Sequence, residues 1–462
     1  MKRFTYEFKR MVWLLLMLVC AHGTTVAQKV GDTFTVGNLY YRVLNEQEVK
    51  VAGHVDRSDA TGEVIIPETV EAAEWNRYYI VTTIGYAAFL DCDGLTSINI
   101  PESVTTIADE AFLGCNRLTA IMVNADNAKF SSFEGVLFDK SLQKLIQYPA
   151  GKQGEYDIPN SVITIGSRAF YDCDRLTAIN IPNSVTTIGE YAFQYCRGLT
   201  TINIPNSVTA ITNGAFNECS GLTAINIPNS VTSIGNGAFE DCDELTTINI
   251  PNSVTLIGNG AFNSCSGLTA INIPNSVTLI GNGAFSNCIG VTSINIPNSV
   301  TIIGERAFSY CRGLTNINIS NSVTTIGENT FEGCSGLTTI NIPNSVTSIR
   351  NGAFFYCSEL TTLYFQSIIP PTASMNCFSG CNKIQTIYVS QEAVATYQAT
   401  APYSQYNIQG MDETTGIGEV ETTETPQSGN IYDLNGRLVR TDGNLQALPK
   451  GIYILNGKKV VR

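Results

Sequence analysis

The sequence predicts a β-rich repeat solenoid, in which twenty-three-residue coils stack into one parallel sheet with short helical turns on the bends. Phenylalanine recurs at this constant interval from Phe170 through Phe193 and Phe216 to Phe354, and a cysteine lies three positions after each of these phenylalanines. Most repeats also contain Leu-x-x-Ile-x-Ile directly before a proline. Self-similarity at a fixed period indicates stacked structural repeats, and we expect about twelve of them.

Alternating apolar residues define the strand of each coil. In one repeat, Leu245, Ile248 and Ile250 have the spacing of a strand whose isoleucines point inward. Pro251 then lacks a backbone donor and ends the regular pairing. The residues that follow, Val254–Ile257, form a second short extended segment.

The rest of the repeat forms the bend. Gly258 turns the chain, and Ala261, Phe262 and Cys265 are spaced to lie on the inward face of one helical turn. The Asn-Gly pair before them is too poor in helix formers for a longer helix. A single coil cannot bury its own apolar face, so neighbouring coils bury it for one another.

Changes in composition divide the chain into segments. We expect a signal peptide at residues 1–27, an entry cap at 28–82, the solenoid at 83–389, an exit cap at 390–411, an acidic linker at 412–429 and a C-terminal β-module at 430–462. Residues 124–157 interrupt the repeat, because the interval from Phe112 to Phe170 is not a multiple of the repeat period. This segment still carries apolar residues, so we expect irregular or hairpin coils there.

The first 27 residues have the pattern of a secretory signal. The apolar run Met11–Cys20 precedes small residues at Thr25–Ala27 and is too short to span a bilayer. Lipidation of Cys20 is the alternative to cleavage after Ala27. Basic residues come first: Lys2, Arg3, Lys9 and Arg10.

Composition argues against several functions. The net charge of −13 and the lack of any block of basic residues exclude a nucleic-acid footprint. His54 is the one histidine after the signal peptide, so neither a catalytic triad nor an ordinary histidine metal site has its residues. We expect His54 to lie on the surface, and we predict no catalytic residue, metal or cofactor. Calcium at the Asp-Cys-Asp triplets, such as Asp172 and Asp174, is a minor alternative.

The repeat cysteines predict a buried column of unreactive thiols. Side chains stacked in register point in parallel, so their Cβ atoms do not converge to the roughly 3.8 Å that a disulfide needs. Free cysteine is also among the most buried residue types. Cys377 and Cys381, near the exit, are the pair that we expect to bridge if any does.

The outward positions of the strands form the first candidate binding surface. They carry Asn in nearly every coil, either as a ladder of amides bonded from coil to coil or as a neutral face for a repetitive partner. The row changes to Tyr364 and Tyr388 at the exit, and these two are the preferred single-residue candidates. The asparagines of this row are Asn180, Asn203, Asn226, Asn249, Asn272, Asn295, Asn318 and Asn341.

The bends form a second candidate surface, because tyrosine and arginine vary there from coil to coil and are favoured at contact hot spots. The residues concerned are Glu190, Tyr191, Tyr195, Arg197, Arg306, Tyr310, Arg312, Phe355 and Tyr356.

The repeat resembles the BspA-like branch of the leucine-rich repeats, which are surface proteins found widely in Bacteroidetes. The residues Ile-Pro-Asn-Ser-Val-Thr-x-Ile-Gly-x-x-Ala-Phe-x-x-Cys-x-x-Leu carry the resemblance, as at Ile227 to Leu245. It implies a non-enzymatic cell-surface adhesin that binds a host or extracellular-matrix protein. A glycan-binding or structural surface-layer component is the alternative.

The tail carries a separate resemblance. Residues 431–439 and 451–461 each place Asn-Gly between apolar runs, which is typical of a β-hairpin. This pattern is similar to the C-terminal sorting domains that the type IX secretion system recognises. The resemblance implies display at the cell surface, whereas a small β-module that only protects the terminus is the alternative.

Overall fold

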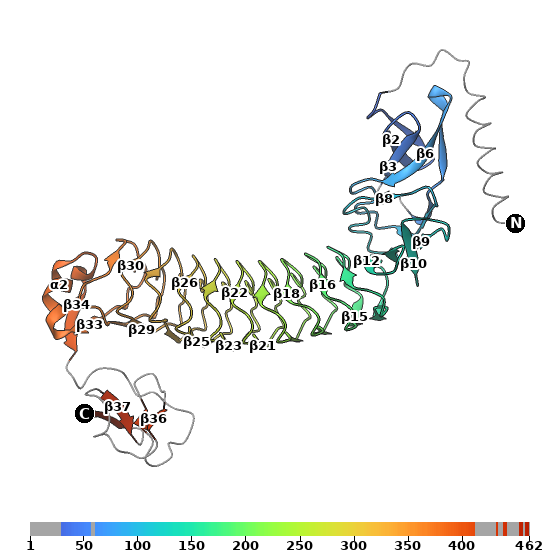
Figure 1. The fold of residues 1–462 in the computed structure, drawn as a ribbon. Coiled ribbons are helices and arrows are strands. Elements are labelled where there is room, and N and C mark those ends of the chain that lie inside the picture. The colour runs from blue at the N-terminus through green and yellow to red at the C-terminus, as the bar shows by residue number, and fades with distance from the viewer. Residues whose placement is uncertain are drawn as a thin grey trace.

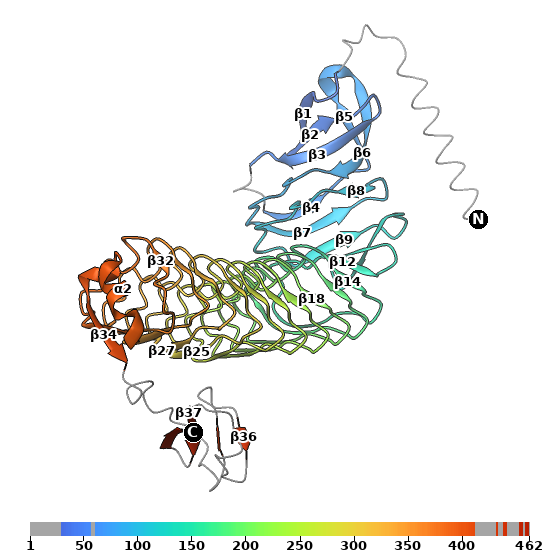
Figure 2. The same ribbon diagram turned by 60° about the vertical axis from the view of Figure 1, so that its left-hand side comes forward.

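The computed structural model describes residues 29–56, 61–411, 431–432, 438–440, 452–455 and 458–461. Stacked coils form a long array, and the entry segment and first coils turn away from the axis of that array (Figures 1 and 2). A cap containing the helix α2 (Val394–Ala399) closes the other end. The predicted signal peptide and acidic linker lie outside the described residues.

The entry segment is a small sheet that covers the first coil. Phe34, Tyr41 and Tyr79 are buried beneath it, and β6 continues the sheet into the first coil by pairing with β8 (Thr106–Ile107). The sheet has the order β1 (Thr33–Val36), β2 (Leu39–Val43), β3 (Glu48–His54), β6 (Arg77–Ile84) and β5 (Thr69–Ala72). A 3₁₀ turn, η1 (Ala73–Trp75), joins β5 to β6.

The main sheet contains twelve strands, one from each successive coil, all paired in parallel. Equivalent residues one repeat period apart are register partners, as with Ile202 and Ile225. The strands are β13 (Gly154–Asp157), β15 (Leu176–Asn180), β17 (Thr201–Asn203), β19 (Ala224–Asn226), β21 (Thr247–Asn249), β23 (Ile271–Asn272), β25 (Ser293–Asn295), β27 (Asn316–Asn318), β29 (Thr339–Ile342), β31 (Thr362–Phe365), β33 (Thr386–Ser390) and β34 (Asn407–Met411).

The sheet differs from the expectation of one continuous ladder in two respects. Before the interruption, β4 (Gly62–Ile65), β7 (Leu95–Ile100) and β9 (Ala120–Val123) form a separate three-stranded sheet. The Val-Thr-x-Ile segments also pair in parallel and form a second row of two-residue strands. This row comprises β14 (Thr164–Ile165), β16 (Thr187–Ile188), β18 (Ala210–Ile211), β20 (Ser233–Ile234), β22 (Leu256–Ile257), β24 (Leu279–Ile280), β26 (Ile302–Ile303), β28 (Thr325–Ile326), β30 (Ser348–Ile349) and β32 (Thr372–Ala373).

The bends are tight turns and not the helical turns expected from the sequence. In each bend, the residue before the Ala-Phe pair and the residue before the cysteine have positive φ, as at Arg168 (56°) and Asp172 (58°). A left-handed residue between Phe170 and Cys173 interrupts right-handed helix geometry, so only three-residue turns form. Cys196 N–H, for example, donates to the Phe193 carbonyl at 3.2 Å.

The core of the array is a column of stacked phenylalanine rings beside a column of thiols. From Phe170 to Phe378, neighbouring ring centroids lie 4.9 to 5.7 Å apart, with planes within 17° of parallel. From Cys196 to Cys381, each repeat thiol donates to the phenylalanine carbonyl of the preceding coil, as Cys265 does to Phe239 at 2.9 Å. The thirteen described cysteines are all free and buried, so Cys377 and Cys381 are not bridged.

The interruption is a hairpin followed by a shortened coil. The strands β10 (Phe130–Phe133), β11 (Val136–Asp139) and β12 (Lys144–Gln147) pair in antiparallel order, and β12 then joins the second row through β14. The hydrophobic core divides at this point. One cluster runs from Phe34 to Leu137, and the other runs from Val136 to Ile408.

The exit cap closes the array with tyrosines. The 3₁₀ turns η2 (Gln391–Ala393) and η3 (Tyr403–Gln405) flank α2, and β34 adds a last parallel strand to the main sheet. Tyr397 and Tyr403 are buried, and their hydroxyls donate to the carbonyls of Ser367 (3.1 Å) and Pro371 (2.9 Å).

The tail forms a small antiparallel sheet. Its strands have the order β36 (Leu438–Arg440), β35 (Ile431–Tyr432), β37 (Ile452–Leu455) and β38 (Lys458–Val461). Leu455 is the register partner of Lys458 in the antiparallel β37–β38 pair, and the predicted Asn-Gly turn between them lies outside the described residues.

Candidate functional site

The asparagine row lies on the outer face of the main sheet, where the sequence places it. Seven of the eight side chains are exposed and Asn341 is half-buried. The expected amide ladder is largely absent from this row. Asn318 Nδ2 donates to Asn295 Oδ1 at 2.9 Å, and this is the one amide–amide bond of the row among the described residues. Most of these amides therefore face outward and are available to a partner.

An asparagine ladder does form, but on the bends. The side-chain oxygen of Asn236 accepts from the backbone N–H of Asn259 at 2.8 Å, and Asn259 does the same for Asn282. Asn213 and Asn236 make the equivalent bond at 2.9 Å. Here a side-chain oxygen reaches a backbone donor of the next coil, because the bends bring successive coils into direct register.

The exit end of the outer face carries a stacked tyrosine pair. Tyr364 on β31 and Tyr388 on β33 are register partners, with ring centroids 5.1 Å apart and planes 14° from parallel. Both residues are half-buried. Burial, together with the neighbouring Tyr388, raises the pKa of the Tyr364 phenol, so the hydroxyl is neutral at physiological pH. The structure thus brings together the two residues singled out by the sequence.

Uncharged side chains surround this pair. Asn341 is the register partner of Tyr364 on one side, and Gln409 is the partner of Tyr388 on the other. A second outward row runs parallel to the first, and Asn407 Nδ2 donates to Thr386 Oγ1 within it at 3.4 Å. The exit face is therefore an aromatic centre with hydrogen-bonding amides and hydroxyls around it.

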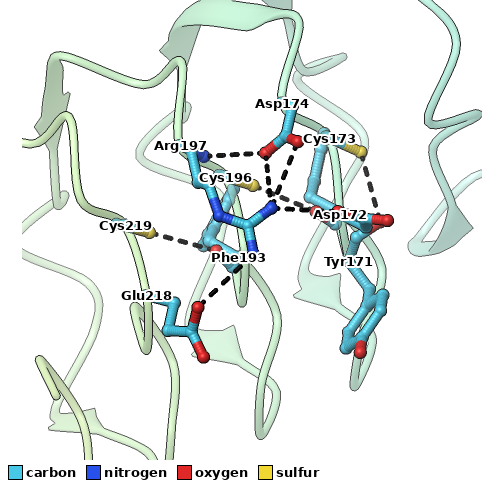
Figure 3. A network of polar contacts seen from close by, with 10 residues as sticks. Tyr171, Asp172, Cys173, Asp174, Phe193, Cys196, Arg197, Glu218 and Cys219 are labelled. Carbon is cyan, nitrogen blue, oxygen red and sulfur yellow. Dashed lines mark hydrogen bonds and ion pairs between the residues drawn. The ribbon is translucent and has the colours of Figure 1, made fainter. Parts of the chain in front are cut away.

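The bend at Arg197 is the most charged cluster among the variable bends (Figure 3). The guanidinium lies 3.6 Å from Asp172, 3.2 Å from Asp174 and 3.4 Å from Glu218. It also lies over the Tyr195 ring, 4.8 Å from the centroid. Because Arg197 contacts the coils on both sides, the structure gives this cluster a role in joining coils.

The same contacts explain the Asp-Cys-Asp triplet at this bend. Asp172 and Asp174 both form ion pairs with Arg197. Burial is the largest cause that raises the pKa of the Asp172 carboxyl, and the charge of Asp174 adds to it, whereas the charge of Arg197 lowers the pKa. No group of three potential metal ligands occurs within the described part of the chain.

Other bends carry smaller groups of aromatic and charged residues. Tyr310 OH donates to Glu332 at 2.6 Å, and Arg312 lies over the Tyr310 ring at 6.0 Å. Phe355 and Tyr356 contact each other with centroids 4.3 Å apart, and Tyr356 is exposed. These residues lie in separate coils and do not form one continuous site.

His54 is buried, contrary to the expected surface position. It is the last residue of β3 in the entry sheet, where Leu39 of β2 is its register partner, and its Nδ1 lies 2.5 Å from the Asp56 carbonyl oxygen. The sequence around His54 is polar and did not reveal this burial, which follows from the place of β3 as an inner strand of the entry sheet, between β2 and β6.

A cavity of about 310 Å³ lies at the interruption, and sequence reasoning did not single it out. It is lined by Glu110 and Phe112 from the coil before and by Ser167, Arg168 and Glu190 from the coils after. Arg168 pairs with Glu110 at 3.2 Å and lies over the Tyr191 ring at 5.2 Å. Tyr86 OH donates to the same Glu110 carboxylate at 2.6 Å. The sequence signal was the interval between Phe112 and Phe170, which does not fit a whole number of repeats.

No helix in the described part of the chain is long and apolar enough to cross a membrane. The model of the BspA type leucine rich repeat region matches residues 77–149, 147–269, 257–385 and 314–413. These matches overlap and together cover most of the chain.

Solved structures with similar folds include a leucine-rich repeat protein from Bacteroides ovatus. It is 28% identical, with a TM-score of 0.55, and the match covers 82% of this chain and 100% of that one. A leucine rich cell surface protein from Faecalibacterium prausnitzii is 28% identical over 80% of this chain and 98% of its own, with a TM-score of 0.47. No curated protein sequence matches.

Proposed function

Because the chain belongs to the BspA-type leucine-rich repeat family, we propose that it is an exported cell-surface protein that binds a host or extracellular-matrix protein. The observation that carries this proposal is the stacked pair of Tyr364 and Tyr388. This pair lies where the otherwise uniform outer face of the main sheet changes.

The pair has the properties of a protein-contact centre. Tyrosine is enriched among residues that dominate binding energy, and such residues are surrounded by near-neutral contacts that exclude water. Stacking holds both rings in place before a partner arrives, so less side-chain entropy is lost on binding. The surrounding asparagine, threonine and glutamine side chains supply the polar rim that such interfaces have.

Ring geometry favours a protein over a glycan at this end. Sugars pack against the open face of an aromatic ring. Tyr364 and Tyr388 cover one face of each other, and the strands of Asn341 and Gln409 flank the remaining faces. Ring edges and hydroxyls are left for a partner. The exposed asparagine row from Asn180 to Asn318 is the observation that favours the alternative, a glycan-binding or structural surface-layer component.

Export and display form part of the proposal. Residues 1–27 act as the signal peptide, and residues 430–462 act as a type IX sorting module. The antiparallel β37–β38 pair supports the β-structure expected for this module. Deleting residues 430–462 is expected to leave the protein in the periplasm, and unchanged surface display after the deletion would contradict the sorting role.

The binding proposal is tested by replacing both tyrosines with alanine. Purified wild-type chain is first screened on immobilised matrix proteins and on a glycan array. For each ligand found, Tyr364→Ala with Tyr388→Ala is expected to weaken binding by at least about 30-fold, which corresponds to a hot spot of about 2 kcal/mol or more.

A matched control replaces Asn226 and Asn249, which lie in the same row at mid-array. This control is expected to leave affinity for a matrix protein within about threefold. Binding to glycans that depends on Asn226 and Asn249 but not on the tyrosines would favour the alternative function. Retained binding in both variants would place the site elsewhere.

A further inference from the structure

The coil between Phe112 and Phe170 lacks part of its bend. The corner of a coil is the Gly-x-x-Ala segment between the second strand row and the repeat phenylalanine. In a regular coil, phenylalanine follows the second-row isoleucine by five positions, as from Ile165 to Phe170. In the shortened coil, Leu145 is the register partner of Ile165, and Tyr148 stacks on Phe170 at 5.0 Å. Tyr148 thus takes the phenylalanine position only three positions after Leu145, and two corner residues are missing.

The missing corner leaves backbone groups without their usual partners. Every repeat phenylalanine from Phe170 to Phe354 donates its N–H to a carbonyl of the next coil, as Phe89 also does. The corner residue two positions earlier does the same, as Arg168 does to Glu190 at 3.0 Å. Among the described residues, the N–H groups of Glu110 and Phe112 have no such acceptor.

The opposite wall has a matching acceptor. In regular coils, the carbonyl of the first corner residue accepts from the preceding coil, as Asn259 accepts from Gly237 at 2.8 Å. No backbone donor within the described residues reaches the Ser167 carbonyl, which occupies this position. Glu110, Phe112 and Ser167 all line the cavity of about 310 Å³, a volume at the lower end of ligand pockets.

The cavity therefore has donors on one wall and an acceptor on the other, with the missing corner of the shortened coil between them. We propose that it binds a short extended segment of another polypeptide, which takes the place of the missing corner. Such a segment supplies carbonyls to Glu110 and Phe112 and an N–H to Ser167, in the manner of strand addition to an open sheet edge. Such binding pairs three backbone groups that have no backbone partner among the described residues.

The walls also select the side chains of the segment. The first corner position stacks against Asp109 on one side and Ser167 on the other, with Glu190 one coil further. A small amide suits this position better than an acid, and the array places asparagine there in Asn236, Asn259 and Asn282. The second corner position has positive φ, as at Gly260 (59°), which favours glycine. An Asn-Gly segment is thus the preferred occupant.

This inference does not depend on the tyrosine pair, because the exit face lies at the other end of the array. The probe is an acetylated and amidated tetrapeptide, Gly-Asn-Gly-Ala, which copies residues 258–261. Site-resolved hydrogen exchange on the full chain measures the amides of Glu110 and Phe112. In the free protein both are expected to exchange faster than those of Arg168 and Phe170, whose N–H groups are bonded.

At a peptide concentration about ten times Kd, exchange at Glu110 and Phe112 is expected to slow by about tenfold. Two controls keep the test specific. In the first, a peptide with N-methylglycine at the second glycine lacks the N–H for Ser167 and is expected to give no protection. In the second, Ser167→Trp fills the cavity and is expected to abolish protection, whereas Glu328→Trp, at the same position of a regularly stacked coil, retains it.

Slow exchange of both amides in the free protein would overturn the inference, and so would the absence of any protection at the solubility limit of the peptide. Equal protection by the N-methylated peptide would place binding outside the cavity. That comparison uses the unmodified protein, so the inference stays testable even if Ser167→Trp fails to fold.

Discussion

The regular array and the shortened coil at the interruption contain the same kinds of residues. They differ in how far neighbouring coils stack their aromatic rings and pair their backbone groups. Between Phe170 and Phe354 each ring stacks on both neighbours, and each bend donates to the next. In the coil before the shortened one, among the described residues, Phe112 stacks only on Phe89, at 5.9 Å, and its N–H lacks a backbone acceptor. The core divides within the hairpin of the interruption, and a cavity lies where the corner of the shortened coil is missing.

This comparison shows how local the energetics of a solenoid are. Each coil contacts only its neighbours, so the stability is approximately a sum of coil and interface terms. A defect in one coil therefore weakens one interface and leaves the rest intact. The interruption also coincides with the turn of the molecule between its entry part and the array (Figure 2).

The largest expected effect is a core truncation in the regular array. Phe262→Ala removes a buried ring with two stacked neighbours, at 5.3 Å each, and is expected to cost about 3–5 kcal/mol in free energy of unfolding. Phe112→Ala removes a ring with one stacked neighbour beside the cavity and is expected to cost less by about 0.5–1.5 kcal/mol. Urea unfolding followed by circular dichroism measures both. Equal costs would show that the interruption is packed as well as the array.

An effect of intermediate size is expected in the reactivity of two thiols, one beside the shortened coil and one within the regular array. Cys173 lies next to the shortened coil, and its sulfur is 4.0 Å from the Tyr148 carbonyl and 3.7 Å from that of Tyr171. Cys265 donates at 2.9 Å within the array, and burial raises its pKa. Both are expected to label slowly at about pH 8, but Cys173 about tenfold faster, because opening at the weaker interface takes less free energy. Mass spectrometry after a timed alkylation pulse locates the labelled residue, and faster labelling of Cys265 would reverse the order of interface strengths.

The smallest expected effect concerns the ion pair across the interruption. Arg168 and Glu110 bridge the coils on either side of the missing corner, and the pair is partly exposed. Arg168→Ala is expected to cost about 0.5–1 kcal/mol. Arg306 occupies the same coil position with the same φ of 56° and makes no ion pair within the described part of the chain, so Arg306→Ala is the control and is expected to cost close to zero. Equal unfolding midpoints for the two variants would leave the bridge without a role in stability.

Much of the fold could be predicted from the repeat alone. The register, the inward phenylalanine and isoleucine columns and the free, buried repeat thiols follow from spacing, because identical units can share a core only when stacked in register. The location of Tyr364 and Tyr388 on the outer face follows from alternation along a strand. Their stacking required the in-register parallel pairing of β31 and β33.

Other expectations failed where the outcome depended on neighbouring coils. The helical turn gave way to turns with positive φ, in which alternate N–H groups of a bend donate to the next coil and the others donate within the bend. The asparagine ladder lies on the bends and not on the strands, because the bend amides meet a backbone donor one coil away. His54 is buried because β3 is an inner strand of the entry sheet.

The sequence by itself determined the repeat, its period and the residues of its core, because hydrophobic periodicity is a property of one coil that recurs unchanged. Only the tertiary structure decided where that pattern leaves backbone N–H and carbonyl groups without a hydrogen-bond partner in the neighbouring coil. Within the described chain, the N–H groups of Glu110 and Phe112 and the carbonyl of Ser167 make no backbone hydrogen bond, and all three belong to positions that are ordinary in sequence. They form a cavity because the coil between them is two residues short, and the loss becomes visible only when the coils are stacked.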